Sequence, residues 1–259
     1  MSDSCLQDKK LTRVVSLGDY NQAEVLVLDV ADVIALEQRI AAAGTPLAEL
    51  MDHAGTSLAQ RVQAHAERAG ESQTIVVLAG NGNNGGDGWV AARELARMGH
   101  AVTLIAAKQP EEIEAQPARD TAIAAMKQFD DLGVSVSIDP SETELQDILD
   151  QAGIIVDAIL GTGFTHDTVR APFDSWITAA NERRTHGALI IAADCPSGLN
   201  AQTGSTAATC IQADETVTMI TSKTGLHRGQ GPEACGVLTV APLCDLEPIF
   251  NSHTMIPHI

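Results

Sequence analysis

Hydrophobic positions along the chain follow two patterns: continuous apolar runs typical of buried strands, and amphipathic stretches typical of helices. TIVVLAG (74–80) is an apolar run of the kind expected for a strand buried on both faces. We predict strands at 74–80, 101–107, 134–138, 153–161, 188–194, 215–221 and 237–242, separated by helices at 88–99, 111–129 (broken or starting late at Pro117), 142–151 and 172–185. This alternation predicts a single three-layer α/β/α domain with a Rossmann-like, mostly parallel central sheet.

The N-terminal part has a different pattern. Residues 1–22 are polar and unpatterned, and we expect them to form a flexible extension of one domain that spans 23–259. Two amphipathic helices are predicted at 30–43 and 47–70, with Gly44-Thr45-Pro46 between them as a stop and restart signal. VLVLDV (25–30) fits either a short strand or the lead-in to the first helix.

Three predicted strands end in polar, glycine-rich loops: GNGNNGGDG (80–88), DAILGTGFTHD (157–167) and ADCPSG (193–198). Ligands of open parallel sheets bind beyond the carboxyl ends of the strands. The glycines allow a ligand to approach backbone N–H groups closely, and a helix that starts near Gly88 adds its positive dipole end. We therefore expect an anionic ligand to bind at these three loops.

A dinucleotide-dependent dehydrogenase is the simplest alternative, because Gly80, Gly82 and Gly85 match G-x-G-x-x-G. That class requires an acidic residue about 20 positions later, at the end of the second strand, to bind the ribose. The corresponding stretch is LIAA, followed by Lys108, and it contains no carboxylate. We also find no substrate-binding half with a proton relay, so the sequence disfavours a dehydrogenase.

Composition narrows the possible partners. Aromatic residues make up 3% of the chain and the formal net charge is −18, which is unsuited to nucleic-acid binding. An anionic ligand must therefore be held locally, by backbone N–H groups or a bound cation.

The sequence also predicts a cytoplasmic protein. Five cysteines without a C-x-x-C pair indicate a reducing compartment and no disulfide framework. The first residues lack the apolar region of a signal peptide, and no run of about 18 apolar residues is present. We therefore expect no membrane association.

Five segments together resemble one known family: NGNNGGDG (81–88), VDAILGTG (156–163), DCPSGLNAQTG (194–204), ELMDHAG (49–55) and KTGLHRGQGPEACGVLTV (223–240). The chain resembles the NAD(P)H-hydrate epimerases, the N-terminal domain of the NAD(P)H-hydrate repair proteins, in a stand-alone form. The resemblance covers roughly residues 31–245. It implies an enzyme of metabolite repair that interconverts the R and S forms of NADH or NADPH hydrated at C6 of the nicotinamide ring.

The family resemblance also implies the site residues and the partners. A potassium ion would be held by Asn84, Asp157 and Ser197, whose hard oxygen atoms suit an alkali or alkaline-earth cation and not zinc. The hydrated nucleotide would contact Asn83, Asn84, Gly85, Gly86, Asp87, Gly161, Thr162, Gly163, Phe164, Thr165, His166, Asp167 and Asp194. A separate ATP- or ADP-dependent dehydratase would act downstream. The sequence leaves the oligomeric state open, and the two N-terminal helices offer one surface for a homodimer.

The chemistry needs one positioned carboxyl group. The lone pair of the ring nitrogen can expel the C6 hydroxyl, provided that the hydroxyl is protonated as it leaves, and water can then return to either face. We assign the acid and base roles to Asp194, which the following Pro196 would hold in place.

Several residues allow more than one interpretation. Asp87 fits either a helix N-cap or a ligand contact. Lys223 fits a contact with a phosphate or with the site's carboxylates, or a solvated position. Cys195 fits a small apolar core residue, or an exposed thiol open to oxidation. The acidic stretches 111–114 and 212–215 are expected to be solvated.

A second hypothesis comes from another class of protein, a non-catalytic nucleotide-binding or scaffold protein that reuses the fold. Such a protein would be expected to lose the ion-binding and carboxylate residues. Asn84, Asp157, Asp194 and Ser197 are all present, which favours the enzyme.

Overall fold

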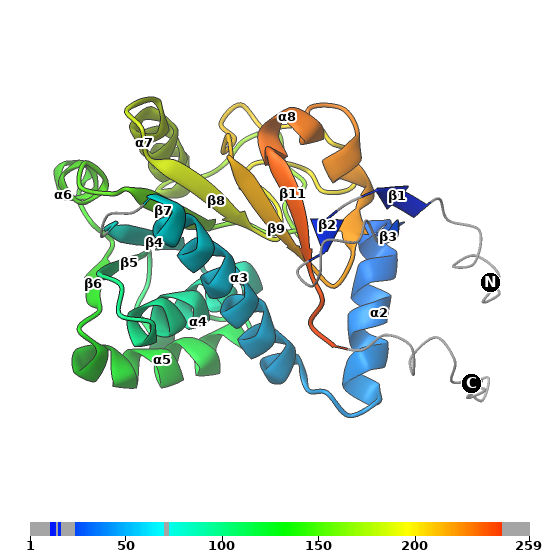
Figure 1. The fold of residues 1–259 in the computed structure, drawn as a ribbon, viewed down its shortest axis with the longest axis horizontal. Coiled ribbons are helices and arrows are strands. Elements are labelled where there is room, and N and C mark those ends of the chain that lie inside the picture. Colours follow the sequence, from blue (N-terminus) through cyan, green and yellow to red (C-terminus); the bar gives the residue numbers. More distant parts are fainter. Residues whose placement is uncertain (1–10, 14, 17–23, 70–72, 245–259) are drawn as a thin grey trace.

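The structure is a computed structural model that describes residues 11–13, 15–16, 24–69 and 73–244. Its centre is an eight-stranded sheet in the order β2-β11-β9-β8-β7-β4-β5-β6 (Figure 1), and all of its strand pairs are parallel. The strands are β2 (Val15–Ser16), β4 (Ile75–Ala79), β5 (Val102–Ala106), β6 (Ser135–Ile138), β7 (Ile154–Ala158), β8 (Leu189–Ala193), β9 (Glu215–Met219) and β11 (Val237–Ala241). The predicted α/β class with a mostly parallel sheet is confirmed.

Helices cover both faces of this sheet (Figure 1). The helices are α2 (Val30–Ala42), α3 (Leu47–Ala69), α4 (Asn83–Arg97), α5 (Ala118–Leu132), α6 (Glu142–Leu149), α7 (Phe173–Thr185) and the short α8 (Gly231–Cys235), with 3-10 turns η1 (Pro110–Glu112) and η2 (Thr224–His227). The position of β4 between two hydrophobic cores explains why its sequence is continuously apolar. Ile75, Val77 and Ala79 belong to the core under α3, α4 and α5, whereas Val76 and Leu78 belong to the core under α6 and α7.

A second, three-stranded sheet holds the start of α2. Strand β3 (Glu24–Leu28) pairs in antiparallel fashion with β1 (Leu11–Arg13) and in parallel with β10 (Ser222–Lys223). VLVLDV thus provides both a strand and the helix start. Strands β1, β2 and β10 have two or three residues each, too few to show a periodic pattern, and we predicted none of them. Most of the predicted extension 1–22 lies outside the described residues.

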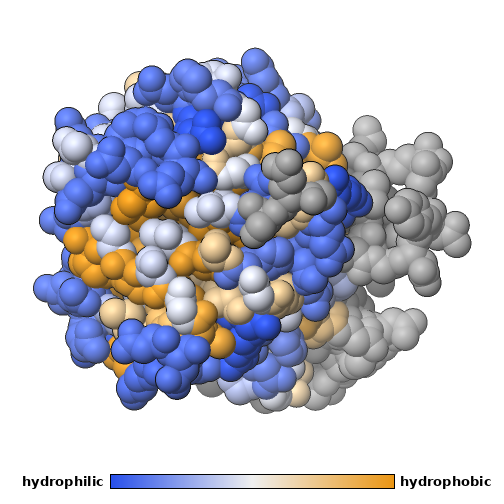
Figure 2. Space-filling model, turned by 60° about the vertical axis from the view of Figure 1, so that its left-hand side comes forward, coloured by the Kyte–Doolittle hydropathy of each residue, from blue (hydrophilic) through white to orange (hydrophobic). Residues whose placement is uncertain are grey.

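The surface of the described residues is mixed. Figure 2 shows hydrophobic residues in the middle of one face, surrounded by hydrophilic ones. Among the large hydrophobic residues, Ile34, Leu47 and Val237 are exposed. No helix in the described part of the chain is long and apolar enough to cross a membrane.

Two predicted details are wrong. Helix α4 begins at Asn83 and not near 88, because the glycine-rich segment is itself the first helical turn and Gly82 is the N-cap residue. Glu215, expected on a solvated face, is 1% exposed. It accepts hydrogen bonds from Arg61 Nε (2.5 Å) and Thr239 Oγ1 (2.6 Å), and its other oxygen lies 2.6 Å from His65 Nε2. The Glu111, Glu112 and Glu114 side chains are exposed, as predicted.

Glu215→Gln is expected to lower the free energy of unfolding by about 3 kcal/mol at pH 7, because it breaks a buried ion pair between α3 and the sheet. Although burial alone raises it, hydrogen bonds from Arg61, Thr239 and His65 lower the pKa of Glu215 below its usual value of 4.5. The stabilisation is therefore fully present above pH 4.5 and is lost as the pH falls below it.

Urea unfolding at pH 7 and pH 3.5 measures this loss. The exposed Glu111 provides the control, since Glu111→Gln removes a carboxylate without breaking a buried pair. Equal losses for Glu215→Gln at both pH values would contradict the interpretation.

Candidate functional site

The pocket lies at the point where the strand order reverses. From β4 the chain continues to β5 and β6 on one side, whereas β7, β8 and β9 lie on the other. The loops that follow β4 and β7 therefore diverge, and this leaves a crevice at the carboxyl ends of the strands. A cavity of about 720 Å³ occupies this crevice, as the sequence predicted.

Most of the predicted substrate-binding residues line this cavity. They are Asn83, Asn84, Asp87, Gly161, Thr162, Gly163, Phe164, His166 and Asp194. Gly85 and Gly86 lie behind the wall, where an added Cβ would meet Gly80 and Met51. Thr165 and Asp167 are exposed and outside the lining, and the carbonyl of Asp167 accepts a hydrogen bond from Ala208 N–H (3.0 Å). In the far half of the 161–167 loop, Thr165 and Asp167 therefore lie outside the cavity, whereas His166 lines it.

The start of α4 is built for close backbone approach. An added Cβ on Gly85 would lie 1.9 Å from the carbonyl oxygen of Gly80, and one on Gly80 would lie 1.9 Å from that of Ile159. These contacts hold the turn against the neighbouring loop. The first N–H groups of a helix have no intrahelical partner, so those at the start of α4 can bind an anion.

Asn84, Asp157 and Ser197, the predicted ion-binding residues, meet around the backbone of Leu160. Asn84 Nδ2 donates to the Leu160 carbonyl (3.0 Å), and Leu160 N–H donates to Ser197 Oγ (2.8 Å). Ser197 Oγ donates to Asp157 Oδ1 (2.5 Å), and Ser197 N–H donates to Asp157 Oδ2 (2.8 Å). The three loops are therefore hydrogen-bonded into one unit.

The residues of this cluster fit a hard cation. Asn84 Oδ1 is buried and has no hydrogen-bond partner, so an acceptor oxygen is left for a ligand. The other polar groups are carboxylate, hydroxyl and carbonyl oxygens, the donor type that alkali cations take. Among the described residues, no group of three or more His, Cys, Asp or Glu side chains is placed to hold a metal ion.

Asp157 is fully buried at the end of β7. Burial raises its pKa to about 6, even though hydrogen bonds from Ser197 and Ile159 lower it. A buried carboxylate without a cationic neighbour is costly, and a bound cation would remove part of that cost.

Asp194 lies in a strained turn. Its φ is 62°, and Cys195 N–H donates to the carbonyl of Ala193 (2.7 Å) across it, which is the hydrogen bond of a tight γ-turn. Strand β9 ends in the same way, with Ile220 at φ 64° and a 2.7 Å bond from Thr221 N–H to the Met219 carbonyl. Asp194 and Ile220 both line the cavity. Two adjacent strands thus store strain at the pocket, as functional sites often do.

Lys223 fixes the carboxylate of Asp194. The ammonium group is 1% exposed and donates to Asp194 Oδ1 (2.5 Å), Thr218 Oγ1 (2.9 Å) and the Met219 carbonyl (2.9 Å). Among the alternatives for Lys223, contact with a site carboxylate is confirmed and a solvated position is wrong. Met219 N–H also donates to Asp194 Oδ1 (3.1 Å), so this oxygen is held by several donors.

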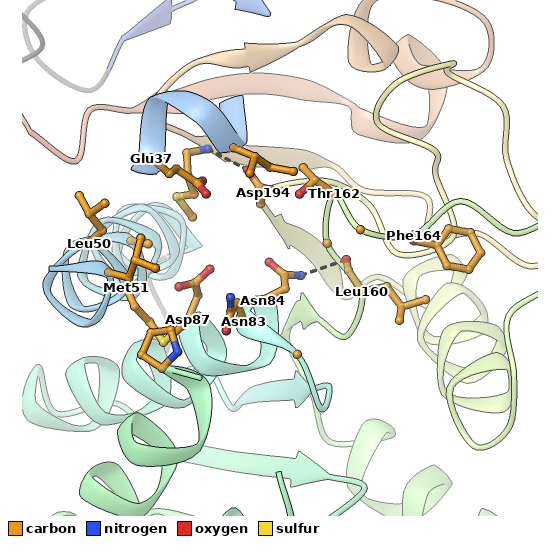
Figure 3. A pocket seen from close by; sticks show the side chains of 18 of the residues that line it. Glu37, Leu50, Met51, Asn83, Asn84, Asp87, Leu160, Thr162, Phe164 and Asp194 are labelled. Atoms are coloured by element: carbon orange, nitrogen blue, oxygen red, sulfur yellow. Dashed lines mark hydrogen bonds between the residues drawn. The ribbon is translucent and has the colours of Figure 1, made fainter. Parts of the chain in front are cut away.

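Two further carboxyl groups face Asp194 across the cavity: Asp87 from α4 and Glu37 from α2 (Figure 3). Burial raises the pKa of Asp87 well above its usual value, and the nearby carboxylates of Asp194 and Glu37 raise it further. Burial, followed by Asp194, also raises the pKa of Glu37. Asp87 is inside α4 and is not its N-cap residue, so that alternative is wrong.

The remaining candidates have minor positions. Cys195 is fully buried in a small core with Leu199 and Leu226, which confirms the apolar interpretation. His166 is exposed at the pocket edge and packs edge-on to Phe164. His227 lies 2.7 Å (Nε2) from Ser222 Oγ, and burial lowers its pKa.

Helices α2 and α3 also line the cavity, which we did not predict from the sequence. Their contribution comes from Ile34, Glu37, Gln38, Leu47, Leu50, Met51 and Ala54. A signal for Glu37 was present. The buried face of α2 consists of Val33, Leu36 and Ile40, and Glu37 lies four residues after Val33 and three before Ile40. A carboxylate on the apolar face of an amphipathic helix points to a special environment.

These features define a class of protein: a parallel α/β protein that presents a helix start, a cluster of oxygen-bearing residues (Asn84, Asp157 and Ser197) and a strained carboxylate at the switch point of its sheet. Residues 47–225 match the family described as YjeF-related protein N-terminus, and the chain belongs to that family.

Relatives with assigned names are similar over most of the chain. The bifunctional NAD(P)H-hydrate repair enzyme Nnr of Hyperthermus butylicus is 37% identical over 214 residues, 82% of this chain and 37% of that protein. The NAD(P)H-hydrate epimerase of Limosilactobacillus reuteri is 34% identical over 167 residues, 64% of this chain and 72% of that protein. The chain thus spans less than half the length of the bifunctional relative. The crystal structure of the yeast protein ynu0 shares the fold, with a TM-score of 0.69 at 23% identity over 83% of this chain and 86% of that one.

Proposed function

We propose that this protein is an NAD(P)H-hydrate epimerase that interconverts the R and S forms of NADH or NADPH hydrated at C6 of the nicotinamide ring. One observation carries the proposal: Asp194 is held in a strained turn inside a cavity that is also lined by the start of α4 and by Asn84, one of the three residues of the proposed ion cradle. Relatives named as epimerases and repair enzymes support it.

The proposed reaction needs no redox partner. Asp194 and its neighbouring carboxyl groups exchange a proton with the C6 hydroxyl as it leaves and with the water that returns to either face. Lys223 keeps one oxygen of Asp194 occupied, so the other is the oxygen left for the ring. The helix start at Asn83 and the 161–164 segment hold the rest of the nucleotide.

Potassium is the proposed cofactor, held by Asn84, Asp157 and Ser197. When bound, the ion would supply positive charge beside the negative pocket and the phosphates. A separate ATP- or ADP-dependent dehydratase is the proposed partner that consumes the S form.

A coupled assay tests the function. Purified protein is given R-hydrated NADH, and an S-specific dehydratase reports any S form, with either potassium or tetramethylammonium as the cation. Potassium-dependent conversion above the spontaneous rate supports the epimerase. Nucleotide binding without conversion would instead favour the non-catalytic binding or scaffold protein.

Asn84→Ala is expected to abolish stabilisation by potassium, because it removes the buried oxygen that has no other partner. The measurement is the thermal midpoint in potassium chloride minus that in tetramethylammonium chloride. For a 259-residue chain we expect about 2–4 °C in the wild type, if binding contributes about 1 kcal/mol, and none in the variant. Asn83→Ala, at the exposed neighbouring position, is the matched control and should keep the shift. A shift retained in Asn84→Ala would remove Asn84 from the ion cradle.

A further inference from the structure

Glu37 faces the cavity from a part of the chain that lies outside the 47–225 family match. It is half-buried on α2, between the core residues Leu36 and Ile40. Figure 3 shows Glu37, Asp87 and Asp194 around the same space, each from a different element. We refer to these three carboxyl groups as the acidic wall.

Within the described part of the chain, the cation whose charge acts on both Glu37 and Asp87 is Lys223, and its N–H groups already have acceptors. Lys223 Nζ uses its three donor positions on Asp194, Thr218 and Met219, so no N–H is left for Glu37 or Asp87. Among the described residues that line the cavity, none is Lys or Arg. Three carboxyl groups therefore share the charge of one ammonium.

Among the described residues, Lys223 is the one cation whose charge lowers the pKa of Asp87. The α3 side of the cavity is apolar, with Leu50, Met51 and Ala54. Arg93, one helical turn and a half further along α4, binds Asp52 and Glu94. The loop after β7 contributes His166, which is exposed at the edge.

The cavity thus offers acceptors in excess of donors. Asn84 is about nine-tenths buried, lines the same cavity and leaves Oδ1 without a partner. The raised pKa values of Glu37 and Asp87 express the same imbalance, since burial and the neighbouring carboxylates both disfavour their ionised forms. A positive charge brought into this space would be stabilised by the carboxylates of the acidic wall.

We propose that Glu37 is a further residue of the site and that the acidic wall stabilises a positively charged nicotinamide ring, the species formed when the C6 hydroxyl leaves. The identity of the ring rests on the proposed epimerase function. The excess of acceptors over donors rests on the geometry alone.

The charges balance through the step. The C6–O bond breaks and its electron pair stays with oxygen, while the nitrogen lone pair forms a C=N bond and makes the ring positive. A proton from a carboxyl group of the wall joins the leaving hydroxyl as water, so a carboxylate appears as the cation forms. When water adds to C6 from either face, its proton returns to the carboxylate, and nothing is oxidised or reduced.

Oxidised NAD⁺ and NADH test the wall directly, because their rings differ by one positive charge. Calorimetry at pH 7.5 is expected to show tighter binding of NAD⁺ than of NADH to the wild type. Glu37→Gln should reduce this preference roughly three- to tenfold, the scale of one charge interaction at a half-buried site. Glu49→Gln removes an exposed carboxylate of α3 outside the cavity lining and should leave the preference unchanged.

Proton release gives a second readout. NAD⁺ binding should release protons from Glu37 and Asp87, whose pKa values are raised. The release is visible as a binding enthalpy that depends on the ionisation enthalpy of the buffer, and Glu37→Gln should release fewer protons. Asp87→Asn tests the same two quantities if Glu37→Gln proves unstable. The preference for NAD⁺ should also grow as the pH rises, since Glu37 and Asp87, whose pKa values are raised, then ionise.

The outcomes separate the two proposals. Equal affinities for NAD⁺ and NADH, or a preference unchanged in both Glu37→Gln and Asp87→Asn, overturn the wall even if the wild type epimerises. A preference that depends on Glu37 in a protein without epimerase activity would overturn the reaction and keep the wall.

Discussion

Asp194→Asn is expected to lower kcat for epimerisation by at least about 100-fold, because an amide cannot exchange the proton of the leaving hydroxyl. The dissociation constant for NAD⁺ or NADPH should change much less than kcat. Asn is the suitable replacement, since it tolerates the positive φ of 62° at this turn with little added strain. Steady-state kinetics and calorimetry on the same preparation measure both quantities.

The control for Asp194→Asn addresses folding. The variant leaves the ammonium of Lys223, which is 1% exposed, without its anion, and we expect a loss of about 3 kcal/mol in stability. The double variant Asp194→Asn with Lys223→Met removes that charge and should recover much of the stability. Activity should stay low in both. Wild-type turnover in either variant would exclude Asp194 as the group that exchanges the proton.

Gly85→Ala is expected to cost more than about 3 kcal/mol of stability or to prevent folding. The added Cβ would lie 1.9 Å from the carbonyl oxygen of Gly80 and about 3 Å from its amide nitrogen. Both atoms are backbone, so the turn between β4 and α4 must open. Urea unfolding measures the loss, and potassium binding should fall with it because Asn84 is the preceding residue.

Gly82→Ala is the matched control for Gly85→Ala. Nothing lies within 4 Å of the Cβ it would add, and its φ of −107° is accessible to any residue. Replacement of this N-cap glycine should cost less than about 1 kcal/mol. Similar losses for the two variants would mean that the close approach at Gly85 is not what fixes the turn.

The central strands of the fold could be predicted from the sequence because helices cover both of their faces. Strands such as β4 and β7 are covered on both faces, so nearly every residue is apolar and the run stands out. Strands β1, β2 and β10 depend on partners that are distant in the chain, and no local pattern reports such pairing. The start of α4 was predicted five residues late because glycine and asparagine are weak helix formers.

The site was predicted to the level of its loops. Polar residues that directly follow apolar strands can be recognised from the sequence alone, and most of those that we predicted line the cavity. The partner of Asp194 was left open, because only the turn after β9 brings Lys223 back to β8. Strain at Ile220 was not predictable either, since positive φ is unusual for a β-branched residue.

The position of α2 at the cavity determines how much of the chain a fragment must contain to keep a complete cavity. A fragment of residues 47–225 keeps the three loops but lacks α2 with Glu37, and β11, which pairs with β9 and supplies Thr239 to Glu215. Such a fragment would lose one side of the cavity and expose a long edge of the sheet. A chimera that transfers this site into another scaffold, or between relatives, should therefore include residues 24–244 as one continuous segment.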